Sequence, residues 1–172
     1  LLLFLALTSW LLGYPDQALR QSQEALALAQ ELAHSNTLAA ALVLASWLHQ
    51  LCRDGQRAKE RAEAAITLST EQGIPFWLAA GDSCRGWSLA EQGQAEEGIA
   101  QIRQGLAAFR TTGGEVHART HSLVMLAEVC GKVGQTEEGL SVLAEALTVV
   151  NSREERCLEA ELYRLKGELT LK

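Results

Sequence analysis

Residues 126–147 read LAEVCGKVGQTEEGLSVLAEAL, a run that ends one helix, turns at Gly134 and begins a second helix. Its leucines and valines recur at the three- to four-residue spacing of a helix that buries one side. The chain repeats this pattern at residues 89–106, LAEQGQAEEGIAQIRQGL, and at residues 5–26, LALTSWLLGYPDQALRQSQEAL. The pattern therefore predicts a fold built from one repeated helical hairpin.

Three series of small residues share a period of 40 to 41 residues. Two helices approach to about 8–10 Å only where the facing side chains are small. We therefore expect the members of each series to lie at equivalent helix crossings. They are Ala18, Ala58, Gly98 and Gly139; Ala25, Ala65, Gly105 and Ala146; and Ala6, Ser46, Gly86, Ala127 and Gly167.

Glycine, proline and capping residues divide the chain into helices. Pro15 and Pro75 are predicted to begin helices, and Asn36 to cap one. Ser152 with Glu155 is predicted to form a capping box for the last helix. The predicted turns lie at Gly13, Gly55, Gly93 and Gly134, with Gly113-Gly114 between two hairpins. We expect nine helices, at about residues 1–12, 15–33, 36–53, 56–72, 75–92, 94–111, 115–132, 135–150 and 154–171. The fold class is all-α: a right-handed α-solenoid of about four hairpins plus a final helix, forming one domain over residues 1–172.

Composition excludes several partners. The formal net charge of −6 argues against nucleic acid and against an anionic membrane surface, because both are bound by clustered Lys and Arg. Four cysteines without a CxxC pair indicate reduced thiols and a cytoplasmic setting. The apolar run 1–12 is shorter than the roughly 20 residues of a membrane span and predicts a buried helix. Because the helical pattern reaches both ends, we expect a fragment of a longer protein.

The small-residue series, the Gly turn and the Leu/Ile spacing resemble the tetratricopeptide repeat (TPR) over nearly the whole chain. The period of about 40 departs from the usual 34, so the helices are expected to be longer. Most of the aromatic residues of the TPR signature are missing, and no proline closes each repeat.

A finer resemblance lies in residues 134–140, GQTEEGL, and 159–169, EAELYRLKGEL. These resemble the C-terminal repeat region of large bacterial signalling proteins, which join a class III nucleotide cyclase or another regulatory domain to a P-loop ATPase module. The resemblance implies that the parent protein is an ATPase or a cyclase. The segment itself has no GxxxxGK[ST] loop and no cyclase aspartate pair.

No catalytic, cofactor or metal site is expected. His117 and His121 lie four residues apart on a predicted helix, but the sequence HARTH lacks the zincin glutamate, and no third ligand is placed by spacing. Paired glutamates such as Glu96-Glu97 and Glu137-Glu138 begin helices, where the helix dipole favours negative charge. No GxSxG elbow is present. We therefore predict that the segment is not an enzyme.

Trp47 and Trp87 stand one repeat apart, each after a small residue of a first helix, and would line one face. In tetratricopeptide repeats the first helices build the concave surface. The candidate concave binding face is Val43, Trp47, Gln50, Leu51, Ser83, Trp87, Glu91, His121, Val124, Glu128 and Lys132. The alternative is that the tryptophans are core wedges between long helices.

The resulting hypothesis is a protein–protein interaction or scaffolding module of a bacterial signalling or regulatory protein. Its partner would be another protein or a domain of the parent chain. The alternative is a small-ligand sensor whose concave groove forms an apolar pocket lined by Trp. The apolar residues at the N-terminal end also predict self-association through the first hairpin, because a solenoid without a polar cap exposes its apolar end.

Overall fold

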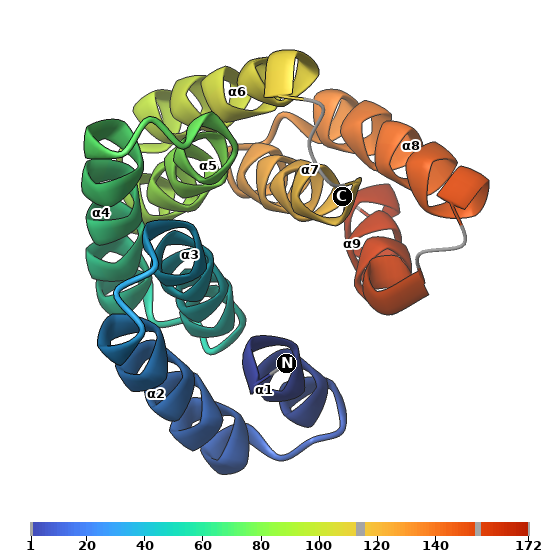
Figure 1. Cartoon of the computed structure of the whole chain (residues 1–172). Helices are drawn as coiled ribbons and strands as arrows, with labels where there is room; N and C mark the ends of the chain where they lie inside the picture. The colour runs from blue at the N-terminus through green and yellow to red at the C-terminus, as the bar shows by residue number, and fades with distance from the viewer. Residues whose placement is uncertain (1, 113–115, 154–155, 172) are drawn as a thin grey trace.

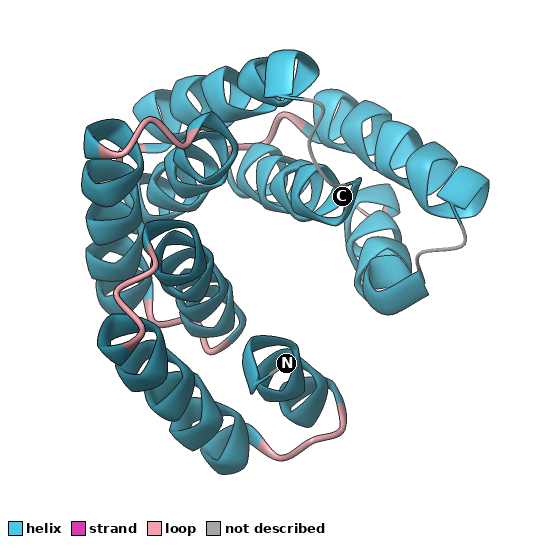
Figure 2. Cartoon of the chain, viewed as in Figure 1, coloured by secondary structure: helices cyan, strands magenta, loops and turns pink. Residues whose placement is uncertain are grey.

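The computed structural model describes residues 2–112, 116–153 and 156–171. Within them lie nine α-helices, one short 3-10 helix and no strand (Figure 2). The helices are α1 (Leu2–Leu11), α2 (Pro15–Glu31), α3 (Ser35–Leu51), α4 (Gly55–Glu71), α5 (Pro75–Glu91), α6 (Ala95–Thr112), α7 (Val116–Lys132), α8 (Thr136–Arg153) and α9 (Glu159–Thr170), with the 3-10 helix η1 (Arg156–Leu158) before α9. The predicted all-helical fold is confirmed.

Consecutive helices pack as antiparallel neighbours and form an arc (Figure 1). The odd-numbered helices line the inside of the arc: α1 contacts α3, α3 contacts α5, α5 contacts α7, and α7 contacts α9. The even-numbered helices form the outer layer, so the core runs between the two layers. The arc curls until α1 and α9, from opposite ends of the chain, face each other across its interior.

The connections between helices repeat one backbone turn. A residue with positive φ follows the helix at Gly13, Ala33, Arg53, Gly73, Gly93 and Gly134. In most of these turns the next backbone N–H bonds to a carbonyl five residues back, as from Tyr14 to Ser9 and from Gln94 to Leu89, which is the Schellman arrangement. The prediction at Gly55 was wrong by two residues: Arg53 makes the turn at φ 60°, and Gly55 begins α4.

Two predicted caps were also wrong. His34 caps α3 by accepting a hydrogen bond at Nδ1 from the Thr37 N–H, whereas Asn36 lies inside the helix and accepts one from Trp77 Nε1 at 3.0 Å. Ser152 lies inside α8, where its hydroxyl bonds back to the Val149 carbonyl at 2.9 Å, and α9 begins only at Glu159. Local polar side chains can satisfy a backbone in more than one register, which limits cap prediction. Gly113, Gly114 and Glu155 lie outside the described residues.

The predicted helix crossings are confirmed most clearly between α5 and α6. A Cβ atom built on Gly86 would lie 2.6 Å from the Gly98 carbonyl oxygen, and one on Gly98 would lie 2.4 Å from the Gly86 carbonyl oxygen. A Cβ on Gly105 would meet the Ala79 carbonyl oxygen at 2.5 Å. Only glycine permits two backbones to approach this closely.

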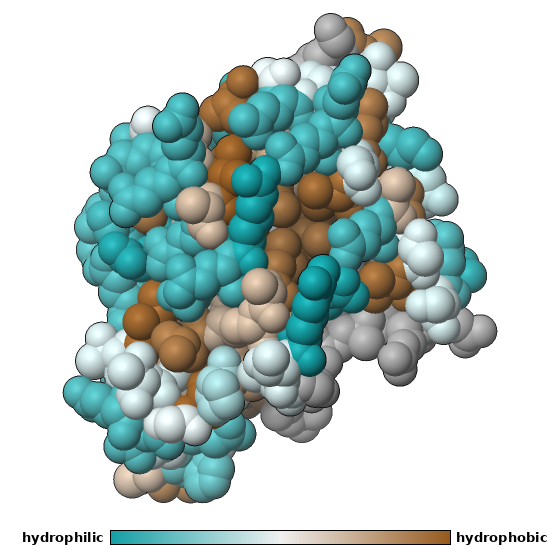
Figure 3. Space-filling view, turned by 90° about the horizontal axis from the view of Figure 1, so that it is seen from above, coloured by the Kyte–Doolittle hydropathy of each residue, from teal (hydrophilic) through white to brown (hydrophobic). Residues whose placement is uncertain are grey.

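The first hairpin leaves large apolar side chains in solvent. Phe4, Leu5, Leu11 and Leu12 of α1 and its turn are exposed, as are Tyr14, Leu28 and Leu32. No helix in the described part of the chain is both long and apolar enough to cross a membrane. By contrast, the face shown in Figure 3, seen from above, is mostly polar, and its apolar side chains gather in a hollow between polar groups.

Candidate functional site

The predicted concave face lies mostly in the interior. Eight of its eleven side chains are buried, Leu51 is partly buried, and Glu91 and Lys132 are exposed; the eight are Val43, Trp47, Gln50, Ser83, Trp87, His121, Val124 and Glu128. The physical reason is curvature, which brings α3, α5 and α7 together on the inside of the arc. A ligand lying along the inner face would therefore reach few of the predicted residues.

Both predicted tryptophans are core residues, as the alternative interpretation held. Trp47 is 2% exposed and stacks on His121, with ring centroids 4.5 Å apart. It also meets the His117 ring edge-on at 5.6 Å. Trp87 is fully buried, and its indole Nε1 donates a hydrogen bond to Glu128 Oε2 at 3.1 Å.

Glu128 is the centre of a buried polar network that joins the three inner helices. Besides the Trp87 indole, its carboxylate accepts a hydrogen bond from Gln50 Nε2 at 3.3 Å and forms ion pairs with Arg53 and Lys132. Only 5% of the Glu128 side chain is exposed. Carboxylates are rarely this buried without partners, and here the partners come from α3, α5 and α7. The network therefore ties residues 78 positions apart.

His121 is held in the same region as a neutral imidazole. Its Nε2 lies 3.2 Å from Gln50 Oε1, so the ring donates to the amide oxygen. Burial, with a smaller contribution from His117, lowers the pKa of His121 from 6.5 to about 3. Protonation of this ring would leave a charge in the core, so the folded state opposes it.

This shift predicts a loss of stability on mild acidification. Between pH 6.5 and 3 the unfolded chain binds a proton at His121 that the folded chain does not. The contribution of the neutral His121 to the free energy of unfolding is therefore full above pH 6.5 and is lost as pH falls. From pH 7 to 5.5 the loss is about 1.3 kcal/mol. Urea unfolding at the two pH values measures it. Burial also lowers the pKa of His49, so the wild type is compared with His121→Gln, which should show a smaller pH slope. An unchanged slope would contradict this assignment.

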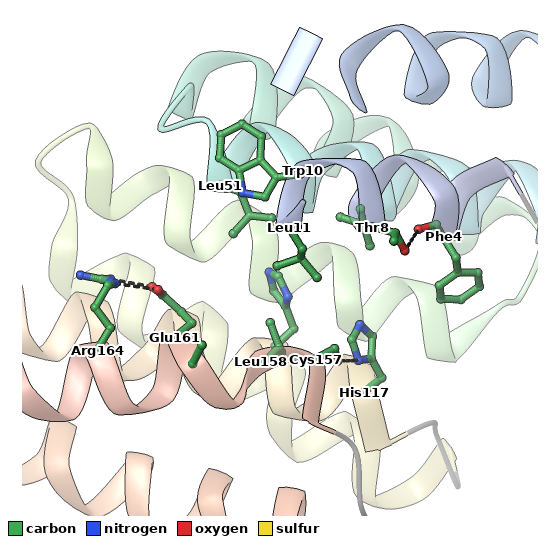
Figure 4. Close-up of a pocket in the computed structure, with 13 residues that line it drawn as sticks. Phe4, Thr8, Trp10, Leu11, Leu51, His117, Cys157, Leu158, Glu161 and Arg164 are labelled. Carbon is green, nitrogen blue, oxygen red and sulfur yellow. Dashed lines mark hydrogen bonds and ion pairs between the residues drawn. The ribbon is translucent and has the colours of Figure 1, made fainter. Parts of the chain in front are cut away.

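A concavity with a volume of about 660 Å³ lies between the two ends of the arc (Figure 4). One wall is α1 and the opposite wall is η1 with α9, while Leu51 of α3 and the histidines of α7 complete it. Most of its lining is apolar or aromatic. The lining residues are Phe4, Leu7, Thr8, Trp10, Leu11, Leu51, His117, His121, Cys157, Leu158, Ala160, Glu161 and Arg164. We call this the α1–α9 pocket.

Polar groups gather on the α7 and α9 sides of the α1–α9 pocket. Cys157 Sγ lies 3.2 Å from His117 Nδ1. The Arg164 guanidinium donates to both oxygens of Glu161, at 2.6 and 2.5 Å, and pairs with Glu168. These groups can hydrogen-bond a ligand, but their arrangement is not that of a metal site: no group of three His, Cys, Asp or Glu side chains in the described residues could hold a metal ion.

The Arg164 side chain also borders a second, charged concavity of about 410 Å³ with Arg53, Glu91, Glu128 and Lys132. Arg164 therefore lies between the mostly apolar α1–α9 pocket and this charged concavity. Every cation named here is already paired with a carboxylate, including Lys132 with Glu91.

Sequence reasoning placed only two of the α1–α9 pocket residues, Leu51 and His121, on its candidate face. It missed Phe4, Trp10, Cys157, Leu158 and Arg164, which all lie on α1 or on the segment from η1 into α9. Their meeting depends on how far the arc curls. The one available signal was the apolar content of residues 1–12, which was interpreted as a buried helix and not as a pocket wall. That prediction was wrong, because only Ala6 and Ser9 of α1 are buried.

Comparisons with known proteins identify the fold but not a family. No protein-family model matches the sequence, and no curated protein matches it. Among solved structures, the apo form of RapI is similar with a TM-score of 0.67 at 14% identity, over 96% of this chain and 60% of RapI. Aspartyl phosphate phosphatase F from Bacillus subtilis is similar with a TM-score of 0.64 at 12% identity, over 96% of this chain and 43% of the phosphatase.

A third similar structure is a kinesin light chain from Podosopora anserina with nearly identical TPR-like repeats. It has a TM-score of 0.60 at 16% identity, and the match covers 99% of this chain and 92% of that chain. At these identities the likeness concerns the fold alone, and the chain spans less than two thirds of RapI and of the phosphatase. The period, the all-helical arc and these similarities together show that the chain folds as a TPR-like α-solenoid.

Proposed function

We propose that the chain is a protein-interaction module that holds an apolar segment of a protein partner, or of its own parent chain, in the α1–α9 pocket. The observation that carries the proposal is the pocket itself: about 660 Å³, mostly apolar, and walled by the two ends of the arc. TPR-like solenoids are a protein-interaction fold, and solenoids bind along such concave surfaces. A segment seated here would contact α1 and α9 at once.

The chemistry of the lining defines the segment. Trp10, Leu11 and Leu158 offer apolar area to one or two anchor side chains. Glu161 and His117, which are partly buried in the pocket lining, carry polar groups that can hydrogen-bond the backbone that carries the anchor. The net charge of −6 favours a neutral or basic partner, mainly through the association rate.

The setting we propose is a cytoplasmic bacterial signalling or regulatory protein with a P-loop ATPase or cyclase module elsewhere in its chain. It rests on the resemblance carried by residues 134–140 and 159–169 and on the four cysteines, which form no CxxC pair. The occurrence of the same fold in a bacterial aspartyl phosphate phosphatase is compatible with a regulatory setting.

The second candidate is a small-ligand sensor using the same pocket. Its volume lies within the roughly 300–1,000 Å³ typical of small-molecule sites, and its few polar groups converge from α7 and α9. A bound small molecule would bridge the two ends of the arc just as a peptide would.

Two adjacent leucines provide a matched test. Leu11 lines the pocket and Leu12 does not, yet both are exposed. Twelve-residue peptides selected from a random array with the intact protein should carry apolar anchors. We expect Leu11→Asp to weaken their binding at least tenfold, because a carboxylate is desolvated against the anchor. Leu12→Asp should change binding less than twofold, as measured by fluorescence anisotropy.

Other outcomes separate the alternatives. Equal weakening by both variants would place binding on the exposed end of α1 and contradict the pocket proposal. A co-purifying small molecule that Leu11→Asp releases, with no peptide selected, would favour the sensor.

We also propose self-association through the exposed apolar residues of the first hairpin. In that case Leu12→Asp lowers the sedimentation coefficient at high concentration while peptide binding persists.

A further inference from the structure

A separate pocket of about 250 Å³ lies where α2, α3 and α4 meet, and it shares no lining residue with the α1–α9 pocket. Its polar lining comes from all three helices: Ser22 and Gln23 of α2, His49 of α3, and Arg57 and Arg61 of α4. No carboxylate lines it, although the protein as a whole carries a net charge of −6.

Arg57 stands where the other outer helices carry acids. Asp or Glu occupies the first turn of α2, α6, α8 and α9, where negative charge suits the helix dipole. The first turn of α4 has no acid and carries Arg57 instead. One repeat later, the positions of Arg57 and Arg61 hold Glu97 and Gln101. Among the outer helices α2, α4, α6 and α8, only α4 lacks an acid in its first turn, and such a departure from local preference is expected at functional sites.

Charge neutralisation within the chain is incomplete at this pocket. Asp54, the N-cap of α4, accepts a hydrogen bond from the Arg57 N–H and lies 3.5 Å from Arg57 Nε. Arg61 forms no ion pair with any residue that the structure describes. His49 is half-buried beside both arginines, and burial lowers its pKa, with Arg57 and Arg61 acting in the same direction and Asp54 and Glu60 opposing.

We propose that this pocket binds a phosphate monoester carried on a side chain of a partner protein. Two guanidinium groups one helical turn apart can each donate two parallel hydrogen bonds to a phosphate. The Ser22 hydroxyl, the Gln23 amide and the N–H of the His49 ring supply further donors from the other two helices. A dianionic group with three terminal oxygens uses this many donors, whereas a carboxylate has only two oxygens.

The experiment titrates the intact chain with a short phosphoserine peptide, its unphosphorylated and glutamate counterparts, and inorganic phosphate, by calorimetry at fixed ionic strength. NMR of the His49 ring gives an independent readout, because a bound dianion raises the pKa of this imidazole. Arg61→Gln should weaken phosphopeptide binding about tenfold or more. Arg20→Gln removes the same charge from an exposed position of α2 outside the pocket and should change binding less than twofold.

If both variants keep the helical circular dichroism of the wild type, a weaker affinity for the phosphopeptide reflects lost binding and not unfolding. Three outcomes would overturn the proposal. Equal weakening by the two variants would mean general charge attraction. A glutamate peptide that binds as well as the phosphopeptide would make this a carboxylate site. Inorganic phosphate that binds as tightly as the phosphopeptide would assign the pocket to a free anion and not to a modified partner.

Discussion

Replacing Gly86 by alanine is expected to destabilise the fold by about 2 kcal/mol, although alanine is the better helix former. The added Cβ would lie 2.6 Å from the Gly98 carbonyl oxygen and 2.9 Å from the Ile102 nitrogen. Both are backbone atoms of α6, so α5 and α6 must separate to admit the methyl group. Thermal unfolding measures the effect, with an expected fall in Tm of roughly 6 °C for a chain of this length.

The control is the same substitution at Gly167, which belongs to the same small-residue series but has nothing within 4 Å of its Cβ position. There the change to alanine should raise stability by about 0.5–1 kcal/mol, since only the helix propensity changes. Opposite signs at two equivalent repeat positions would support close packing as the reason for the glycine. Equal effects at Gly86 and Gly167 would contradict it.

Replacing Glu128 by alanine is expected to cost about 3 kcal/mol. The substitution removes the acceptor of the buried Trp87 indole and of Gln50, and it leaves Arg53 and Lys132 without their shared carboxylate. The two cations are partly exposed and can be hydrated, so most of the cost comes from the buried donors. The midpoint of urea unfolding gives the size of the effect.

Glu145→Ala serves as the matched control, because Glu145 pairs with Arg119 at 2.5 Å on the protein surface. Exposed ion pairs contribute little, so its cost should stay below about 1 kcal/mol. Similar urea midpoints for the two variants would show that the Glu128 network does not stabilise the inner face.

Features that depend on contacts within one repeat could be predicted from the sequence. The crossing at Gly86 and the turns at Gly13, Gly93 and Gly134 depend only on residues fewer than 41 positions apart, which is less than one repeat. Arg53 was missed because its turn uses a non-glycine residue at positive φ, and the prediction assigned the turn to Gly55, two residues later.

The contacts inside the arc could not be predicted, because they depend on how far the arc curls. The curl is the sum of small rotations between successive hairpins. Gln50 and Glu128 meet from α3 and α7, and α1 faces α9 across the whole chain. One signal was available. Trp47, Trp87 and Glu128 occupy the same repeat position, with steps of 40 and 41 residues. A carboxylate at the position that holds a buried indole in the two preceding repeats indicates a buried network.

The most direct test of the proposed function is leucine-methyl NMR of the 172-residue chain bound to a peptide selected on it. We predict intermolecular nuclear Overhauser effects from the apolar anchor of the peptide to the methyl groups of Leu11, Leu51 and Leu158, which line the pocket from α1, α3 and η1. Contacts from the anchor to Leu28 and Leu32, which are exposed outside this pocket, with none to the other three, would contradict the account.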